Sequence, residues 1–195
     1  MNPLGLEEGG GFIFEMTATH RDHDRPMRAL ISTLASLAIV ATASPALAQT
    51  ATKTGQHNAW ATYSYQSDDG PVCYISSVPT AFNPSEGVNH GDIFFLISNK
   101  PAANVPLEPS FRAAGYEFEE GSRVRVRVGE ASFDMYTQGG WAWVENAADE
   151  PRLVEAMKAG TDMQVAARST RPRDVSYTFS LRGVTAALGA IESCS

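Results

Sequence analysis

The stretch "SRVRVRV", from Ser122 to Val128, carries the clearest structural signal in this sequence. Valine and arginine alternate through it, so Val124, Val126 and Val128 share one face of an extended chain and the arginines share the other. One apolar and one polar face are typical of an antiparallel strand that packs on a core from one side. The stretch therefore predicts a half-buried strand in a β-rich fold.

Segments on both sides of this stretch also favour strands. Downstream, Ala131–Tyr136 and Trp141–Glu145 flank the turn sequence "TQGG" and predict a hairpin. The prolines within Lys100–Pro109 predict a loop or an irregular edge. Asp92–Asn99 is almost continuously apolar, which predicts a strand buried on both faces. The remaining predicted strands are Ala59–Tyr65, Val72–Val78, Thr161–Ser169 and Val175–Leu181.

Two short helices are predicted near the end of the chain. In the first, Ala148–Gly160, Asp149 is the expected cap, a proline sits in the first turn and Gly160 ends the helix. Its predicted inward residues are Leu153, Val154 and Met157. The second helix spans Gly183–Glu192. Short strands with one or two helices and no βαβ alternation predict a mostly-β antiparallel sandwich.

The N-terminal region has the layout of a secretory signal peptide. In residues 27–48 a basic start precedes an apolar run, a helix break at Pro45 and the small residues Ala46 and Ala48. This layout predicts cleavage after Ala48. The apolar run is shorter than the roughly 20 residues of a membrane span. Residues 1–26 are interpreted as a leader or a misassigned start, with Met16 and Met27 as alternative first residues.

Residues 49–195 are then expected to form one soluble domain. The full chain has 15 basic and 22 acidic residues, a formal net charge of −7, and no basic cluster. Nucleic-acid binding is not expected, because phosphate neutralisation by basic side chains supplies most of that affinity. No later apolar run approaches membrane-spanning length, so no transmembrane segment is expected after cleavage.

The two cysteines, Cys73 and Cys194, both lie in the predicted exported part. Lone cysteine pairs in an oxidising compartment most often form a disulfide, and this one would tie the chain end to an early strand. A free thiol pair, a redox pair and a lipid anchor are the alternatives. A redox pair usually shows C-x-x-C, and a lipoprotein needs cysteine at position 49, where this chain has glutamine.

No catalytic, metal-binding or cofactor-binding motif is found. His57 and His90 are far apart in sequence, no G-x-S-x-G elbow is present, and phosphate-binding glycine loops are missing. "NHGD" offers a single histidine and a single aspartate, which is little for a metal site. We expect both histidines to be solvated loop residues. The alternative is an envelope hydrolase or other enzyme that uses one of them with a nearby carboxylate.

Two features favour binding. Arg123, Arg125 and Arg127 form a stripe on one strand face, which suits an anionic partner, although a solvated face paired with acidic neighbours is the simpler interpretation. Trp141 and Trp143 share a strand face near a turn. If exposed, they would suit a glycan or protein contact; if buried, they belong to the core.

Three segments resemble the invasion-associated locus B family, a group of exported proteins of alphaproteobacteria. Asp174–Leu188, "DVSYTFSLRGVTAAL", is similar to the last strand of that family. Leu153–Ser169 is similar to its helix that ends in Lys-Ala-Gly before a strand. "AWATYSY" followed by Cys73 resembles its opening tryptophan strand and cysteine. The similarity covers most of residues 60–188, through short motifs.

The resemblance implies an immunoglobulin-like sandwich, a location in the periplasm or at the outer membrane, or secretion, and no known catalytic residues. It implies a partner that is an envelope protein, a host protein or a glycan. The chain also departs from the family: Ser64 stands where many members have a cysteine, and the central hairpin has Met135, Tyr136 and Trp141 in place of a further cysteine pair. A divergent branch with its own disulfide pattern is therefore expected.

Overall fold

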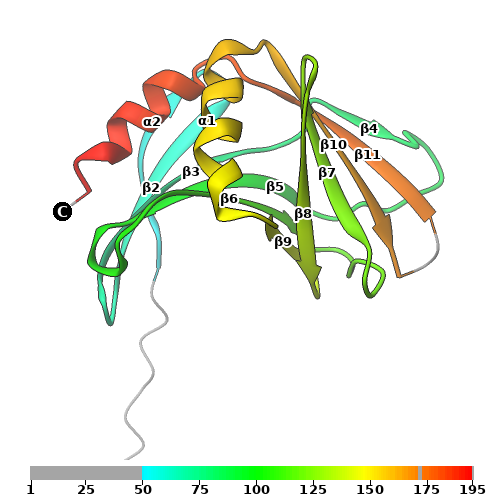
Figure 1. The fold of residues 1–195 in the computed structure, drawn as a ribbon, viewed down its shortest axis with the longest axis horizontal. Helices are drawn as coiled ribbons and strands as arrows, with labels where there is room; N and C mark the ends of the chain where they lie inside the picture. Colours follow the sequence, from blue (N-terminus) through cyan, green and yellow to red (C-terminus); the bar gives the residue numbers. More distant parts are fainter. Residues whose placement is uncertain (1–49, 171–172, 195) are drawn as a thin grey trace, which may run out of the picture. The chain divides into compact units, whose positions relative to one another are not determined.

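The computed structural model describes residues 50–170 and 173–194, and these form a mostly-β domain with two α-helices (Figure 1). The predicted signal peptide and leader lie outside the described residues. The strands and helices are β1 (Thr52–His57), β2 (Trp60–Ser67), β3 (Gly70–Ser77), β4 (Ala81–Asn83), β5 (Ile93–Lys100), β6 (Val105–Ala113), β7 (Arg123–Val128), β8 (Ala131–Gln138), β9 (Trp141–Val144), α1 (Glu150–Ala159), β10 (Asp162–Ser169), β11 (Arg173–Ser180) and α2 (Val184–Glu192).

All the strands belong to one antiparallel sheet with the order β1-β2-β3-β5-β6-β9-β8-β7-β10-β11-β4. β5 and β11 are separated in this order by β6, β9, β8, β7 and β10. Even so, the Phe95 ring of β5 lies 6.0 Å from the Phe179 ring of β11. The sheet therefore folds over, so that its two halves face each other across a shared core.

The two distant parts of the sheet also meet through hydrogen bonds. The indole nitrogen of Trp60, in β2, donates to the backbone oxygen of Ser180, in β11, at 3.0 Å. The amide of Ala59 donates to the backbone oxygen of Arg182 at 3.2 Å. Trp60 is fully buried, so this bond also satisfies its one polar atom inside the core.

The prediction for "SRVRVRV" is confirmed as β7. Val124, Val126 and Val128 are buried, and the arginines between them are exposed. The central hairpin is also confirmed, as β8 and β9. The mostly-β antiparallel fold with two short helices is likewise confirmed. The immunoglobulin-like form stays a prediction, because the strands form one continuous sheet where that fold has two separate sheets.

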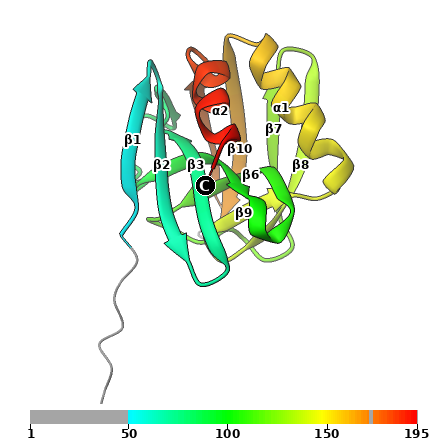
Figure 2. The same ribbon diagram turned by 90° about the vertical axis from the view of Figure 1, so that its left-hand side faces the viewer.

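Both helices add apolar residues to the core, and Figure 2 shows α1 and α2 beside each other against the sheet. α1 packs against β6, and α2 packs against β1, β2 and β3. Leu153, Val154 and Met157 of α1 are buried, as predicted. Asp149 occupies the N-cap position as predicted, but its side chain makes no capping hydrogen bond and pairs with Arg152 at the helix surface.

Cys73 and Cys194 form a disulfide with a Cα–Cα distance of 5.7 Å. The bond fastens the end of α2 to β3. A second tie lies nearby, where the side-chain amide of Asn99 donates to the backbone oxygen of Ile191 at 2.7 Å. The C-terminal helix is thus held against the sheet by covalent and polar contacts as well as by its apolar face.

Three strands were not predicted. β1 lies in a polar segment, β4 has three residues, and β6 begins within the proline-containing segment that predicted a loop. Proline has no backbone N–H group, so a strand such as β6 can contain it at positions where no neighbouring strand needs that donor. The prediction that Asp92–Asn99 is buried on both faces is also wrong, since Phe94 and Leu96 are only partly buried on the outer face.

Among the described residues, neither helix is both long and apolar enough to cross a membrane.

We expect the disulfide to contribute a large share of the stability. The two cysteines are 121 residues apart, and closing such a loop stabilises the folded chain by roughly 5 kcal/mol in the chain-entropy account. Replacing both cysteines with alanine should lower the free energy of unfolding by an amount of this order, measured by urea denaturation. Wild-type protein under reducing conditions is the control and should match the variant. Equal midpoints for the variant and the oxidised protein would contradict this.

Candidate functional site

The outer face of the sheet carries an aromatic ladder, which we define as Arg112, Trp141, Trp143 and Tyr136. Strand register places these side chains on three adjacent strands. Arg112 of β6 pairs with Trp141 of β9, and Trp143 of β9 pairs with Tyr136 of β8. The intervening Ala142 is buried in the core, which confirms that the tryptophans point outward. The ladder therefore lies on one surface of the sheet. Trp141 and Trp143 are neighbours along β9, and Arg112 and Tyr136 flank them from the adjacent strands.

The members of the ladder stack on one another. The Arg112 guanidinium lies 5.1 Å from the Trp141 ring centroid. The Trp141 and Trp143 rings are 5.9 Å apart with an interplanar angle of 15°, and the Tyr136 and Trp143 rings are 5.6 Å apart at 28°. Each tryptophan ring therefore has two stacking neighbours within the ladder.

Exposure differs along the ladder. Both tryptophans are partly buried, and Tyr136, at the end of the stack, is 47 % exposed. Tyr136 was not predicted as a binding residue, although the hairpin register, which the sequence does predict, places it beside Trp143. Arg112 was missed because β6 was not predicted.

The arginine stripe adjoins the ladder, since Arg123 pairs in register with Tyr136. Arg123 donates two hydrogen bonds to the Glu145 carboxylate, at 2.8 and 2.6 Å. Arg125 pairs with Asp134 at 3.0 Å. Arg127 forms no ion pair within the described part of the chain and lies next to Gln164 on β10. The structure thus brings two arginines and both tryptophans onto one surface, where acidic partners compensate the arginine charge.

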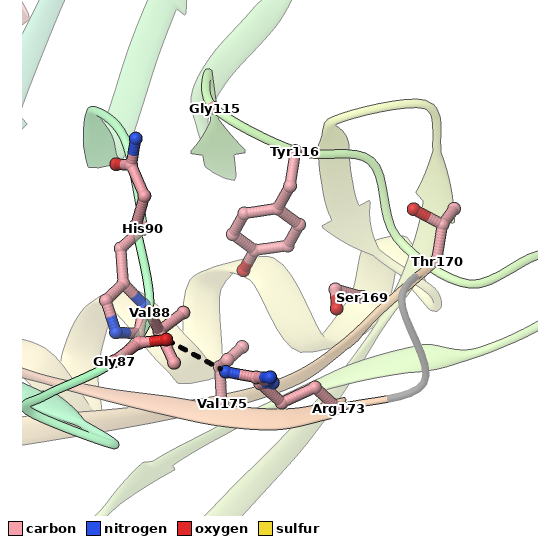
Figure 3. Close-up of a pocket in the computed structure, with 10 residues that line it drawn as sticks. Gly87, Val88, His90, Gly115, Tyr116, Ser169, Thr170, Arg173 and Val175 are labelled. Carbon is pink, nitrogen blue, oxygen red and sulfur yellow. Dashed lines mark hydrogen bonds between the residues drawn. The ribbon is translucent and has the colours of Figure 1, made fainter.

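A second candidate site is a cavity of about 230 Å³ (Figure 3). Three stretches supply its side chains: the loop before β5, the loop after β6, and the region where β10 ends and β11 begins. The side chains that matter for its chemistry are Val88, His90, Tyr116, Thr170, Arg173 and Val175. Figure 3 shows the Tyr116 ring reaching into the space between His90 and Thr170.

Two glycines place His90 and Tyr116 side by side. Gly91 and Gly115 follow and precede these residues, and a Cβ atom built on Gly115 would lie 2.6 Å from the Gly91 Cα atom. Gly91 also has a φ of +63°, which other residues rarely adopt. Only glycine at both positions allows the two backbones to approach this closely.

A chain of hydrogen bonds links the cavity to the core. His90 Nε2 lies 2.8 Å from the Pro84 carbonyl oxygen, His90 Nδ1 lies 3.1 Å from the Tyr177 hydroxyl, and that hydroxyl lies 2.9 Å from the Tyr116 hydroxyl. A carbonyl only accepts, so Nε2 donates, and in neutral His90 the other nitrogen accepts from Tyr177. Tyr177 then accepts from Tyr116.

Burial affects the acidity of both tyrosines. Desolvation raises the pKa of Tyr116 well above its ordinary value, and its hydrogen bond to Tyr177 raises it further. Desolvation also raises the pKa of Tyr177, an effect that the bond from Tyr116 partly opposes. Both phenols are therefore neutral at physiological pH and act as hydrogen-bonding groups.

The sequence-based expectation for His90 needs a correction. We expected a solvated loop histidine, but its side chain is 8 % exposed and both ring nitrogens are hydrogen-bonded. In this arrangement neither nitrogen is free to activate a nucleophile. The loop expectation for His57 is also wrong: it is the partly buried last residue of β1, at one end of the sheet order, and does not line the cavity. Within the described residues, no group of three or more metal-ligating side chains is found.

Comparisons with known proteins agree with one another. A family described as invasion associated locus B (IalB) protein matches residues 60–192. The crystal structure of invasion-associated protein B from Bartonella henselae is similar to this chain, with a TM-score of 0.52 and 14 % sequence identity. The similarity covers 72 % of this chain and 95 % of that one. At this identity the second comparison shows a shared fold. No curated protein matches the chain.

The raised pKa values predict a loss of stability in alkali. Unfolded tyrosine ionises at about pH 10, whereas Tyr116 and Tyr177 hold their protons in the fold, so unfolding releases protons and its free energy falls as pH rises above about 10. Tyr116→Phe should reduce this fall, measured as free energy of unfolding near neutral pH and in alkali. An absorbance titration of the native protein in which every tyrosine ionises together near pH 10 would contradict the prediction.

Proposed function

This chain belongs to the invasion-associated locus B family, and we propose that it is an exported, non-enzymatic envelope protein that binds a protein partner through the aromatic ladder. The supporting observation is the stacked arrangement of Arg112, Trp141, Trp143 and Tyr136 on an outer sheet face. The signal-peptide pattern of residues 27–48 supports export. The Cys73–Cys194 disulfide is compatible with an oxidising compartment, which favours the periplasm, the outer membrane or secretion.

The composition of the ladder suits a protein interface. Tryptophan, tyrosine and arginine are the residues that most often dominate binding energy in such interfaces. Here they are already stacked, so little side-chain freedom remains to be lost when a partner binds. The half-exposed pairs of Arg123 with Glu145 and Arg125 with Asp134 form a charged border at one end of the ladder. An aromatic centre with a polar border is the usual anatomy of an interface.

The stacking favours a protein partner over a glycan. A sugar ring packs its C–H groups flat on a free aromatic face. In the ladder Trp143 stacks with both Tyr136 and Trp141, and Trp141 also lies against the Arg112 guanidinium. This stacking leaves less of each tryptophan face free for a sugar ring, and the half-exposed Tyr136 suits side chains and backbone of another protein. The compensated arginines likewise offer little net positive charge to an anionic lipid or glycan.

The alternative of an envelope hydrolase would need a free general base. The buried position of His90 and the engagement of both its ring nitrogens argue against it in that role. A measured turnover of a defined substrate that is lost on His90→Ala in folded protein would overturn the non-enzymatic proposal.

The ladder can be tested by photo-crosslinking in the native cells. A photoreactive phenylalanine analogue at position 136 should give one adduct of defined mass, because Tyr136 is the most exposed ladder residue. The same analogue at Glu155, exposed on α1, is the matched control and should give none. Adding Trp143→Ala should weaken the adduct about tenfold, since truncating a central interface tryptophan typically costs over 1.4 kcal/mol. Equal adducts at both positions would contradict the proposal.

Export is tested separately by the mass of the mature protein. We expect the protein recovered from the envelope or medium of the native cells to begin at Gln49, because signal peptidase accepts the Ala46-Leu47-Ala48 pattern. Ala48→Tyr should block cleavage and leave the longer form. Recovery of an uncleaved wild-type chain from the cytoplasm alone would refute export without bearing on the ladder.

A further inference from the structure

The cavity beside His90 is a ligand site that is separate from the aromatic ladder. We propose that it binds a small 2-hydroxycarboxylate with a short alkyl group, such as 2-hydroxy-3-methylbutanoate. The carboxylate contacts Arg173, the hydroxyl donates to Tyr116, and the alkyl group packs on Val88 and Val175. This inference does not depend on the proposed protein partner.

Arg173 supplies the anion contact. Its guanidinium lines the cavity and donates to the Gly87 carbonyl oxygen at 3.5 Å, as the dashed line in Figure 3 marks. Within residues 50–170 and 173–194 no carboxylate forms an ion pair with it. Arg123, Arg125 and Arg168 have acidic partners, whereas Arg127, which has none among the described residues, lies outside the cavity. A planar guanidinium that has donors left over, at the wall of a cavity, matches a carboxylate.

Tyr116 supplies a hydrogen-bond acceptor. The hydrogen-bond chain from Pro84 through His90 and Tyr177 uses the Tyr116 proton, so the Tyr116 oxygen has only acceptor capacity left. A ligand group that meets this oxygen must donate. An ammonium group would also donate, but among the described lining residues there is no carboxylate to balance its charge beside Arg173. A neutral hydroxyl next to the carboxylate satisfies both groups.

The volume of the cavity and its apolar lining residues limit the size and polarity of the remaining part of the ligand. A cavity of about 230 Å³ is smaller than the roughly 300–1,000 Å³ of pockets for drug-sized ligands, so a small metabolite fits. Val88 and Val175 provide an apolar wall, which favours a short branched alkyl group over a second charge. The close Gly91–Gly115 approach and the buried hydrogen-bond chain hold the site in shape before a ligand enters.

Calorimetric titration of the purified mature protein with three probes tests the wild-type site without any substitution. 2-Hydroxy-3-methylbutanoate should bind saturably, with a dissociation constant in roughly the millimolar range or tighter. 3-Methylbutanoate, which lacks the hydroxyl, should bind about fivefold to tenfold more weakly. The uncharged amide of the hydroxy acid should bind at least about tenfold more weakly. Absence of saturable binding up to roughly 20 mM of the hydroxy acid would overturn the proposal.

Two variants assign the contacts. Arg173→Gln should weaken both acids about tenfold, whereas Tyr116→Phe should weaken the hydroxy acid about fivefold and leave 3-methylbutanoate unchanged. Arg182→Gln and Tyr65→Phe replace exposed or partly exposed residues outside the cavity and should change neither affinity. Amide chemical shifts in wild-type protein should move at residues 87–90, 115–116 and 173–175. Shifts confined to other residues, or equal affinities for all three probes, would refute the site even where a variant is unstable.

Discussion

The contact of the aromatic rings between β5, β6 and β11 is the interaction on which the rest of the structure depends. Phe95 and Phe111 face Phe179 and Tyr177 across the core, with ring centroids 5.6 to 6.3 Å apart. These rings are fully buried, and their packing holds the two halves of one sheet together. Tyr177 also connects this core to the cavity, because its ring packs on Phe111 while its hydroxyl lies between Tyr116 and His90. Folding of the sheet and assembly of the cavity are therefore one event.

The two candidate sites use the alternation of the strands in different ways. In β9 the inward residue Ala142 packs in the core while the neighbouring tryptophans stack outside, so burial on one face fixes the ladder on the other. The cavity lies at strand ends, where two glycines and a loop replace regular pairing. The ladder presents a broad aromatic surface bordered by the paired residues Arg123 and Glu145, which suits a protein. The cavity is lined by the exposed Arg173, which has no acidic partner among the described residues, and by the Tyr116 acceptor, and these two groups suit a small acid. Family membership specifies neither ligand.

Sequence patterns predicted much of the fold because they reflect which face of a strand or helix is buried. The alternation of β7, the hairpin of β8 and β9, and the inward residues of α1 follow from burial on one side of a regular element. β6 could not be predicted, because prolines are uncommon in strands. It is a strand because it pairs with its neighbours β5 and β9. β1 and β4 lack an apolar pattern for the same reason: they lie at the two ends of the sheet order, and pairing with a neighbour defines them.

The sequence by itself determined the strand pattern, the signal-peptide pattern, the exposed position of the arginine stripe, and two cysteines available for pairing. The tertiary structure alone decided which groups meet. Arg112 reaches Trp141 only because β6 pairs with β9. The sequence suggests that His90 is solvated, but it is buried because the loop after β4 passes over β11, where the Tyr177 hydroxyl donates a hydrogen bond to its Nδ1 atom. Such contacts join residues far apart in the chain, and their energy depends on a sheet that has already folded over, so no local pattern encodes them.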